Sequence, residues 1–470
     1  MSRLFRGSPA VLRDRWTDIF RADTVVHVAM LGSFTAATFQ GWLKDRFAGP
    51  LPYAAADLLV LMAALFWFAG LAIRKKPIAG PPSFAPRVLV LIGVPLLYLI
   101  LPGTPFVIEA AGLRAWALYP VCGLIGLTVI RSPGQVRAYV GLILTLCLIT
   151  AVYGILQYHA GPRAALSVSG LAALRHGSTV FYEAVGRTDF RAFSTFTFPA
   201  PFAGFMVFGM TLAAGLALSK RRPRPQRWLA TLLIPVLFVG MTVSGTRAAL
   251  ITLLVALALT AWYRGLGVRQ ILLLPLLLGA LHAASLLTSG NVIARYATLY
   301  LRENQLWTYV YAPVTIAWRA LALSPFGLGL GRSGVGVPFS IVQSMPPDFF
   351  MPSDGDVGRA AVEMGLIGLA LLAVLIFGLL PFAHRASRRL LGTGADDLAL
   401  GIGPLLLGTG VIVLIGSPLS ASPHGTIWWF LLGALVKTAM LERSERQAEA
   451  SRPEANDASG EQRPQQLHVT

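Results

Sequence analysis

The chain has 470 residues, of which 55% are hydrophobic and only 13% are charged, and its mean hydropathy is +0.66. An ordinary soluble domain is about 25% charged, so this composition excludes a soluble globular protein. The net charge of +18 does not favour nucleic-acid binding. The Lys and Arg residues lie mostly in short segments between apolar blocks, where such charge sets membrane topology.

The apolar residues fall in blocks close to the ~20 residues that are needed to cross a bilayer. We therefore predict an all-α polytopic membrane protein with about 12 spans over residues 24–441. The predicted spans are Thr24–Leu43, Ala54–Ile73, Val88–Leu101, Ala115–Ile130, Ala138–Gln157, Pro199–Leu218, Trp228–Val243, Ala248–Trp262, Ile271–Leu287, Ala361–Phe382, Leu398–Gly416 and Thr426–Met440. The polar, Arg-rich segment 1–23 is not typical of a cleaved signal peptide, because the first apolar block already has spanning length.

Basic residues cluster before the first predicted span and after each even-numbered span, from the second to the twelfth. All of these segments fall on one side, which the positive-inside rule makes cytoplasmic. Residues 1–23 and both termini are then expected in the cytoplasm. Segment 442–470 is rich in Glu, Gln, Arg, Ser and Pro, which predicts a disordered cytoplasmic tail.

Two long loops, 158–198 and 288–360, are expected on the opposite face, where long loops tend to be functional. Three descending helices begin on that face with polar residues. The first group is Arg187 and Arg191, the second is Ser244, Thr246 and Arg247, and the third is Asp354, Asp356, Arg359 and Glu363. Helix beginnings carry unpaired N–H groups and partial positive charge, so together with arginines they predict an anion site, most naturally for phosphate.

Each of these residues also has a structural interpretation. Arg191 could be a solvated loop residue, and Arg247 could extend towards lipid headgroups. Ser244, Thr246 and Asp354 are residue types that cap helices. We nevertheless favour a function for Arg247, because short external turns normally avoid arginine.

Two other sequence patterns do not indicate a functional site. The segment Gly327–Gly331 is similar to a phosphate-binding loop but lacks the Gly-Lys-Ser/Thr ending and a βαβ setting, so we interpret it as a tight turn. The histidines show no ligand spacing, and both cysteines lie within apolar blocks, so neither a metal site nor a cofactor is expected.

Four stretches resemble the O-antigen ligase/polymerase family of bacterial membrane glycan transferases. They are Arg191–Pro199, Thr242–Leu250, Ala320–Gly331 and Asp354–Gly368, and the likeness extends over about residues 139–433. In the last stretch, Glu363-Met-Gly-Leu-Ile-Gly368 is the closest match. The family's Arg-x-x-x-Trp lead-in is not clear, and Arg295, Arg302 and Arg319 are alternatives for its charge.

The resemblance implies an enzyme of the inner membrane whose donor is an undecaprenyl-pyrophosphate-linked saccharide. Arg191 and Arg247 would stabilise the departing diphosphate, and Asp354 would act as the base for the acceptor hydroxyl. A helix end and nearby arginines lower the pKa of a carboxylate, so Asp354 could instead orient the hydroxyl. Ser244, Thr246, Arg187, Arg319, Asp356 and Glu363 are the predicted substrate-binding residues.

The family's ligases usually have His where Asp354 stands, whereas polymerase-like members often have Asp. This difference favours a polymerase, with a ligase that attaches glycan to lipid A core or another acceptor as the alternative. Membrane lipid, a glycan or lipid acceptor and a chain-length regulator are the candidate partners. A lipid-linked saccharide transporter or flippase is the alternative from another class, but no inverted repeat is evident.

Overall fold

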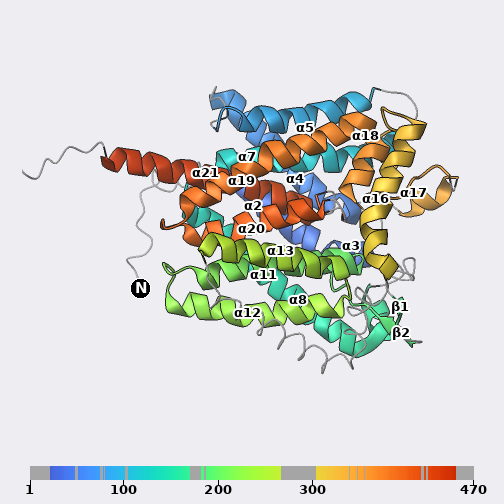
Figure 1. Cartoon of the computed structure of the whole chain (residues 1–470), viewed down its shortest axis with the longest axis horizontal. Helices are drawn as coiled ribbons and strands as arrows, with labels where there is room; N and C mark the ends of the chain where they lie inside the picture. Colours follow the sequence, from blue (N-terminus) through green and yellow to red (C-terminus); the bar gives the residue numbers. More distant parts are fainter. Residues whose placement is uncertain are drawn as a thin grey trace, which may run out of the picture.

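The computed structural model of the chain is a bundle of helices (Figure 1). It describes residues 22–47, 51–74, 78, 80–100, 104–169, 181–184, 187–265, 303–337, 339–346, 348–353, 355–413, 416, 418–419 and 422–450.

The first half of the bundle consists mainly of apolar helices. Its elements are α2 (Ala22–Thr38), α3 (Gln40–Arg46), α4 (Leu51–Arg74), α5 (Phe84–Tyr98), α6 (Phe106–Leu113), the π-helical segment η1 (Arg114–Leu118), α7 (Tyr119–Val129) and α8 (Pro133–Ser169). A short hairpin of β1 (Phe181–Ala184) and β2 (Arg187–Phe190) then precedes α11 (Pro199–Leu218), α12 (Arg224–Val243) and α13 (Arg247–Arg264).

The second half begins with α16 and ends with the long helix α21. Its elements are α16 (Glu303–Leu323), α17 (Phe339–Ser344), α18 (Asp356–Ala373), the π-helical segment η3 (Val374–Leu379), α19 (Leu380–Leu390), α20 (Asp396–Ile412) and α21 (His424–Ala450). α18, η3 and α19 form one continuous run.

Seven helices in the described part of the chain are long and apolar enough to cross a membrane. They are Ala54–Ile73, Phe106–Val129, Pro133–Pro162, Pro199–Leu218, Arg224–Val243, Arg247–Arg264 and Asp356–Leu390. Each overlaps one of the predicted spans. The helices α2, α5, α20 and α21 coincide with four further predicted spans but fall outside this set. The predicted span Ile271–Leu287 lies outside the described residues, so the count of about 12 stays a prediction.

The helical expectation is confirmed, with one exception in the first predicted external loop. There β1 and β2 pair antiparallel, with Phe181 opposite Phe190. The loops also contain more helix than the sequence predicted. α8 continues to Ser169 across a kink at Gly161, and α16 and α17 lie within the second loop. α21 likewise continues to Ala450, into the segment predicted as a disordered tail.

The centre of the bundle is the first half of α21, whose Trp428 and Phe430 are fully buried. α21 crosses α7 at very short distance. A Cβ atom on Gly433 would lie 1.9 Å from the carbonyl oxygen of Gly123, and one on Gly126 would lie 2.3 Å from that of Phe430. Small residues allow this close backbone approach, as is common between membrane helices.

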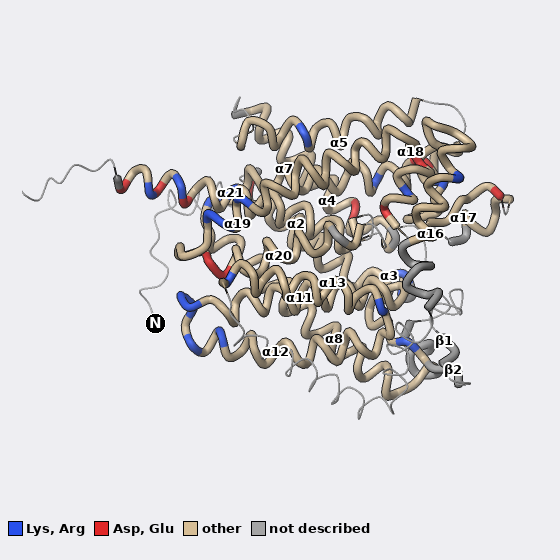
Figure 2. Tube along the Cα trace, viewed as in Figure 1, with Lys and Arg blue, Asp and Glu red and all other residues tan. Residues whose placement is uncertain are grey.

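The two ends of the bundle differ in character (Figure 1). The β-hairpin, α16, α17 and the beginnings of α13 and α18 lie at one end, and the second half of α21 lies at the other. Figure 2 shows Lys and Arg gathered at this second end, at the start of α12, at the end of α19 and along α21. Three of the basic segments that the charge pattern assigned to a single side of the membrane therefore lie at one end of the molecule.

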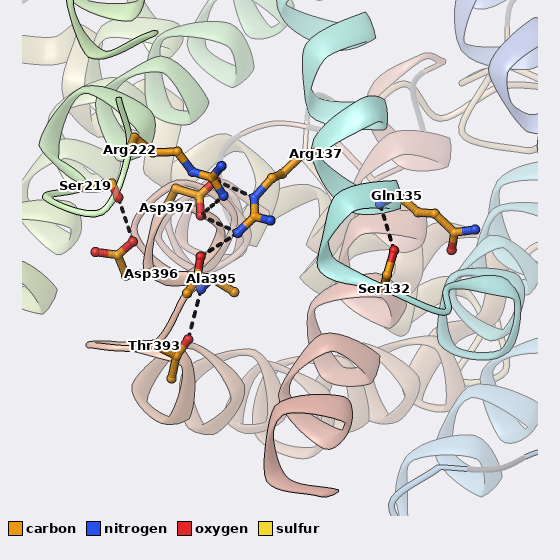
Figure 3. A network of polar contacts seen from close by, with 10 residues as sticks. Ser132, Gln135, Arg137, Ser219, Arg222, Thr393, Ala395, Asp396 and Asp397 are labelled. Carbon is orange, nitrogen blue, oxygen red and sulfur yellow. Dashed lines mark hydrogen bonds and ion pairs between the residues drawn. The ribbon is translucent and has the colours of Figure 1, made fainter. Parts of the chain in front are cut away.

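Asp396 and Asp397 bind the beginning of α20 to neighbouring segments at that end (Figure 3). Asp397 accepts hydrogen bonds from Arg137 Nε and Nη2, each at 3.2 Å, and from Arg222 Nη2 at 3.1 Å. Ser219 Oγ donates to Asp396 at 2.6 Å. The start of α20 is thereby joined to α8 and to the α11–α12 connection.

Candidate functional site

Arg191 lies against the turn between α12 and α13. Its Nε donates a hydrogen bond to the backbone oxygen of Ser244 at 2.9 Å, and its Nη2 donates to Thr246 Oγ1 at 3.0 Å. The neighbouring Ala192 N–H donates to the Val243 carbonyl at 3.0 Å. The first and second predicted groups are therefore brought together, although more than 50 residues separate them in the sequence. Arg187 lies in β2 and Arg191 in the loop before α11, so the first group is not at a helix beginning as predicted.

The turn itself is closed by its own polar groups. Ser244 is fully buried; its Oγ donates to the Met241 carbonyl at 2.6 Å and accepts from the Thr246 N–H at 3.2 Å. Gly245 follows with φ +60°, a conformation that favours glycine. Thr246 occupies the N-cap position of α13 but makes no side-chain cap hydrogen bond there, and its hydroxyl instead receives Arg191.

The geometry has an electrostatic consequence. Arg247 is the first residue of α13, and Arg191 is held at the residue just before it. A helix beginning carries partial positive charge, and the two guanidinium groups lie beside it. Helix beginnings and arginines are groups that proteins use to bind phosphate, so this turn is the candidate anion site.

A second cluster surrounds Glu363 near the beginning of α18. The Glu363 carboxylate is fully buried and accepts hydrogen bonds from Ser333 Oγ at 2.5 Å, Trp116 Nε1 at 2.6 Å and Arg359 Nε at 3.1 Å. Arg359 also donates to the Gly112 carbonyl at 3.1 Å, and its guanidinium lies 5.2 Å from the Trp116 ring centre. Glu363 thus joins α18 to η1 and to the glycine-rich segment. Its carboxylate lies in the interior of the protein, although the sequence predicted that it binds substrate.

The glycine-rich segment is a turn, as the sequence predicted. Gly327, Gly329 and Gly331 have φ values of +87°, +112° and +77°. The Leu328 and Gly329 N–H groups donate to the Val362 and Glu363 carbonyls at 2.7 and 3.2 Å. Those carbonyls are open to the turn because Gly365 breaks the helical conformation of α18, with φ +59°.

The remaining predicted residues are distributed as follows. Asp356 is buried; its N–H donates to the Gly416 carbonyl at 3.1 Å, and its Oδ2 accepts from the Leu419 N–H at 3.3 Å. Arg187 is the first residue of β2, and Arg319 is exposed on α16. Asp354, the predicted base, lies outside the described residues.

Two arginines near the candidate site were not predicted from the sequence. Arg114, the first residue of η1, forms an ion pair with Asp57 at 3.0 Å. It directly precedes a predicted span on the expected external side, so the argument used for Arg247 would have singled it out. Arg332 follows the glycine turn, and its guanidinium lies 3.8 Å from the ring centre of Phe349, with burial lowering its pKa. Its carbonyl accepts from Met351 N–H at 2.9 Å, close in sequence to Asp354.

A narrow crevice adjoins the Glu363 cluster. Trp116, Asp356 and Arg359 line its polar part, and Leu91, Leu375 and Trp429 line its apolar part. Its free volume of about 30 Å³ holds roughly two water molecules, so in this conformation the crevice does not admit a sugar.

The described residues thus place a cationic turn and a buried ion-pair cluster in a helical chain with several helices of membrane-spanning length. No protein-family model matches the chain, and no match was found among curated proteins. The resemblance to the O-antigen ligase/polymerase family therefore depends on the four sequence stretches alone.

Proposed function

We propose that the protein is a membrane glycosyltransferase of the O-antigen ligase/polymerase type, acting at the periplasmic face of the inner membrane. Its donor would be a saccharide on undecaprenyl pyrophosphate, and its acceptor a glycan or lipid hydroxyl. The contact of Arg191 with Ser244 and Thr246, directly before Arg247, is the observation that carries the proposal. It holds one guanidinium next to a second one at a helix beginning, where a diphosphate could bind.

In the proposed reaction the acceptor oxygen attacks the anomeric carbon of the donor. A carbon–oxygen bond forms there as the bond to the diphosphate breaks, and the electron pair leaves on the diphosphate oxygen. Arg191 and Arg247 stabilise this growing charge, which is stronger in the transition state than in the ground state. The hydroxyl proton passes to a base, for which Asp354 is the candidate. The diphosphate linkage is already activated, so the transfer needs no ATP hydrolysis.

The experiment compares Arg247→Ala with Arg264→Ala, because these arginines stand at the two ends of α13. The purified variants are reconstituted in liposomes with a lipid-linked saccharide, and released undecaprenyl pyrophosphate is measured. Loss of one such donor costs about 2.7–4 kcal/mol of barrier, so Arg247→Ala should lower turnover about 100- to 1,000-fold. Arg264→Ala should leave turnover unchanged. Full turnover in Arg247→Ala would remove the central role of this residue.

Polymerase and ligase differ in the glycan that a deletion strain makes. Loss of a polymerase leaves single repeat units attached to the surface acceptor, whereas loss of a ligase removes attachment altogether. Asp354 in place of the ligases' usual His favours the polymerase outcome. Gel analysis of surface glycan separates the two. A strain that makes no surface glycan and accumulates lipid-linked saccharide on the cytoplasmic side would point to a flippase instead.

The proposed sidedness has its own test. Both native cysteines, Cys122 and Cys147, are buried, so single added cysteines can be labelled selectively. Ser444→Cys on α21 should react with a membrane-impermeant maleimide only after the inner membrane is opened, and Ser344→Cys on α17 should react in intact spheroplasts. The reverse pattern would put the Arg191–Arg247 turn in the cytoplasm and exclude a periplasmic reaction.

A further inference from the structure

A cavity of about 470 Å³ lies between α19, the second half of α21 and the segment Gly80–Ser83 that precedes α5. Its polar lining includes Arg385, Arg389 and Arg443, and its apolar lining includes Phe382, Val436 and Met440. The cavity belongs to the end of the bundle where basic residues gather, away from the Arg191 turn (Figure 2).

Among the described residues, no carboxylate forms an ion pair with the three arginines of this cavity. None of the residues that line the cavity is acidic. The ion pairs found among the described residues involve other arginines, namely Arg114, Arg131, Arg137, Arg222 and Arg359. Arg385 is oriented by its own helix, since its Nε donates to the Pro381 carbonyl at 3.2 Å and its guanidinium lies 4.8 Å from the Phe382 ring centre.

Positive charge that only sets topology does not require a cavity among its side chains. Here the volume is within the range of small-molecule sites, about 300–1,000 Å³. Three arginines that line a common space suit a phosphate, which Arg can bind through two parallel hydrogen bonds. The apolar lining on the other side suits the first methylene groups of an acyl chain.

We propose that this cavity binds the headgroup of an acidic phospholipid, with the phosphate on Arg385, Arg389 and Arg443 and the chains leaving past Phe382 and Met440. Basic pockets between membrane helices are typical sites for such headgroups. The proposal does not depend on the transferase activity, because it uses different residues at the opposite end of the bundle.

The experiment measures binding of phosphatidylglycerol to the full-length protein in detergent by native mass spectrometry. The test variant is R385Q/R389Q/R443Q. The matched control is R224Q/R388Q/R446Q, which removes the same charge from α12, α19 and α21 at residues that do not line the cavity. At about fivefold in affinity per basic residue near an anionic headgroup, the test variant should bind roughly 100-fold more weakly, and the control should bind as the wild type does.

Thermal unfolding without lipid checks that both variants are folded, and the wild type should gain melting temperature from phosphatidylglycerol but not from phosphatidylcholine. Equal affinities in the test and control variants would overturn the proposal. A third arm replaces the lipid with glycerol 1-phosphate. If this soluble compound binds as tightly as the lipid, the cavity is a site for free organic phosphate, and the assignment to a phospholipid is wrong.

Discussion

Arg191 donates a hydrogen bond to Thr246 at 3.0 Å, although 55 positions separate the two residues in the chain. A second hydrogen bond, to the Ser244 carbonyl, leaves the guanidinium of Arg191 fixed on two acceptors. A lysine is a point charge on a flexible stem and does not reproduce this planar two-point contact. The structure therefore fixes the orientation of a cation at the beginning of α13 and not only its position.

The contact predicts a catalytic effect for Thr246→Val. Valine keeps the shape of threonine but removes the acceptor, so Arg191 loses one of these two contacts while Arg247 is unaltered. The loss of a hydrogen bond to a charged group, about 1.5–3 kcal/mol, should lower turnover roughly 10- to 100-fold, with little change in melting temperature. Release of undecaprenyl pyrophosphate in liposomes is the measurement.

The same pair gives a control through a double-mutant cycle. If Thr246 acts by orienting Arg191, the variant that combines Thr246→Val with Arg191→Lys should be no slower than Arg191→Lys alone. Additive losses would mean that Thr246 contributes to the reaction independently of Arg191.

Glu363 gives a prediction of a different kind, because its carboxylate is fully buried and accepts from Arg359, Ser333 and Trp116. Glu363→Gln leaves Arg359 as a buried charge without its carboxylate, and breaking such a pair costs about 3–5 kcal/mol. A large decrease in melting temperature is expected. The double variant Arg359→Met/Glu363→Leu should be less destabilised than Glu363→Gln. A Glu363→Gln protein that keeps its stability but loses substrate affinity would instead support the predicted substrate contact.

The sequence predicts the proximity of Arg191 and Arg247 but not the internal position of Glu363, for physical reasons. Arg247 stands at a helix beginning that periodicity and charge locate directly, whereas Arg191 lies in the loop between β2 and α11. The charge pattern assigns both residues to the same face, so their proximity could be anticipated. The internal position of Glu363 could not, because Ala360 to Gly368 has the pattern of an uninterrupted helix. The break at Gly365 comes from tertiary contacts, and a glycine alone does not reveal which conformation it adopts.

Substitution of Gly365 therefore tests whether the break in α18 stabilises the glycine-rich turn. Its φ is +59°, and an added Cβ would lie 2.0 Å from the Pro325 carbonyl oxygen, so Gly365→Ala must move backbone that pairs with the turn. We expect a loss of stability of more than about 2 kcal/mol, from the combined overpacking and strain. The matched control is Gly93→Ala in α5, where an added Cβ has no heavy atom within 4 Å. This control should be neutral or slightly stabilising, since alanine is the better helix former. Equal melting temperatures for the two variants would contradict the described break in α18.

Asp397 provides the last prediction, at the opposite end of the bundle. Its side chain is 3% exposed and holds both Arg137 and Arg222, so Asp397→Asn removes the charge that joins α20 to two other segments. The loss should be about 2 kcal/mol, smaller than for a fully buried pair, because the two arginines are 29% and 17% exposed and water screens them. The control is Asp23→Asn, which removes the partner of Arg131, a side chain that is 60% exposed. Exposed pairs contribute about 0–1 kcal/mol, so Asp23→Asn should unfold at nearly the wild-type temperature in detergent. Equal decreases in the two variants would mean that burial of Asp397 does not determine the strength of this contact.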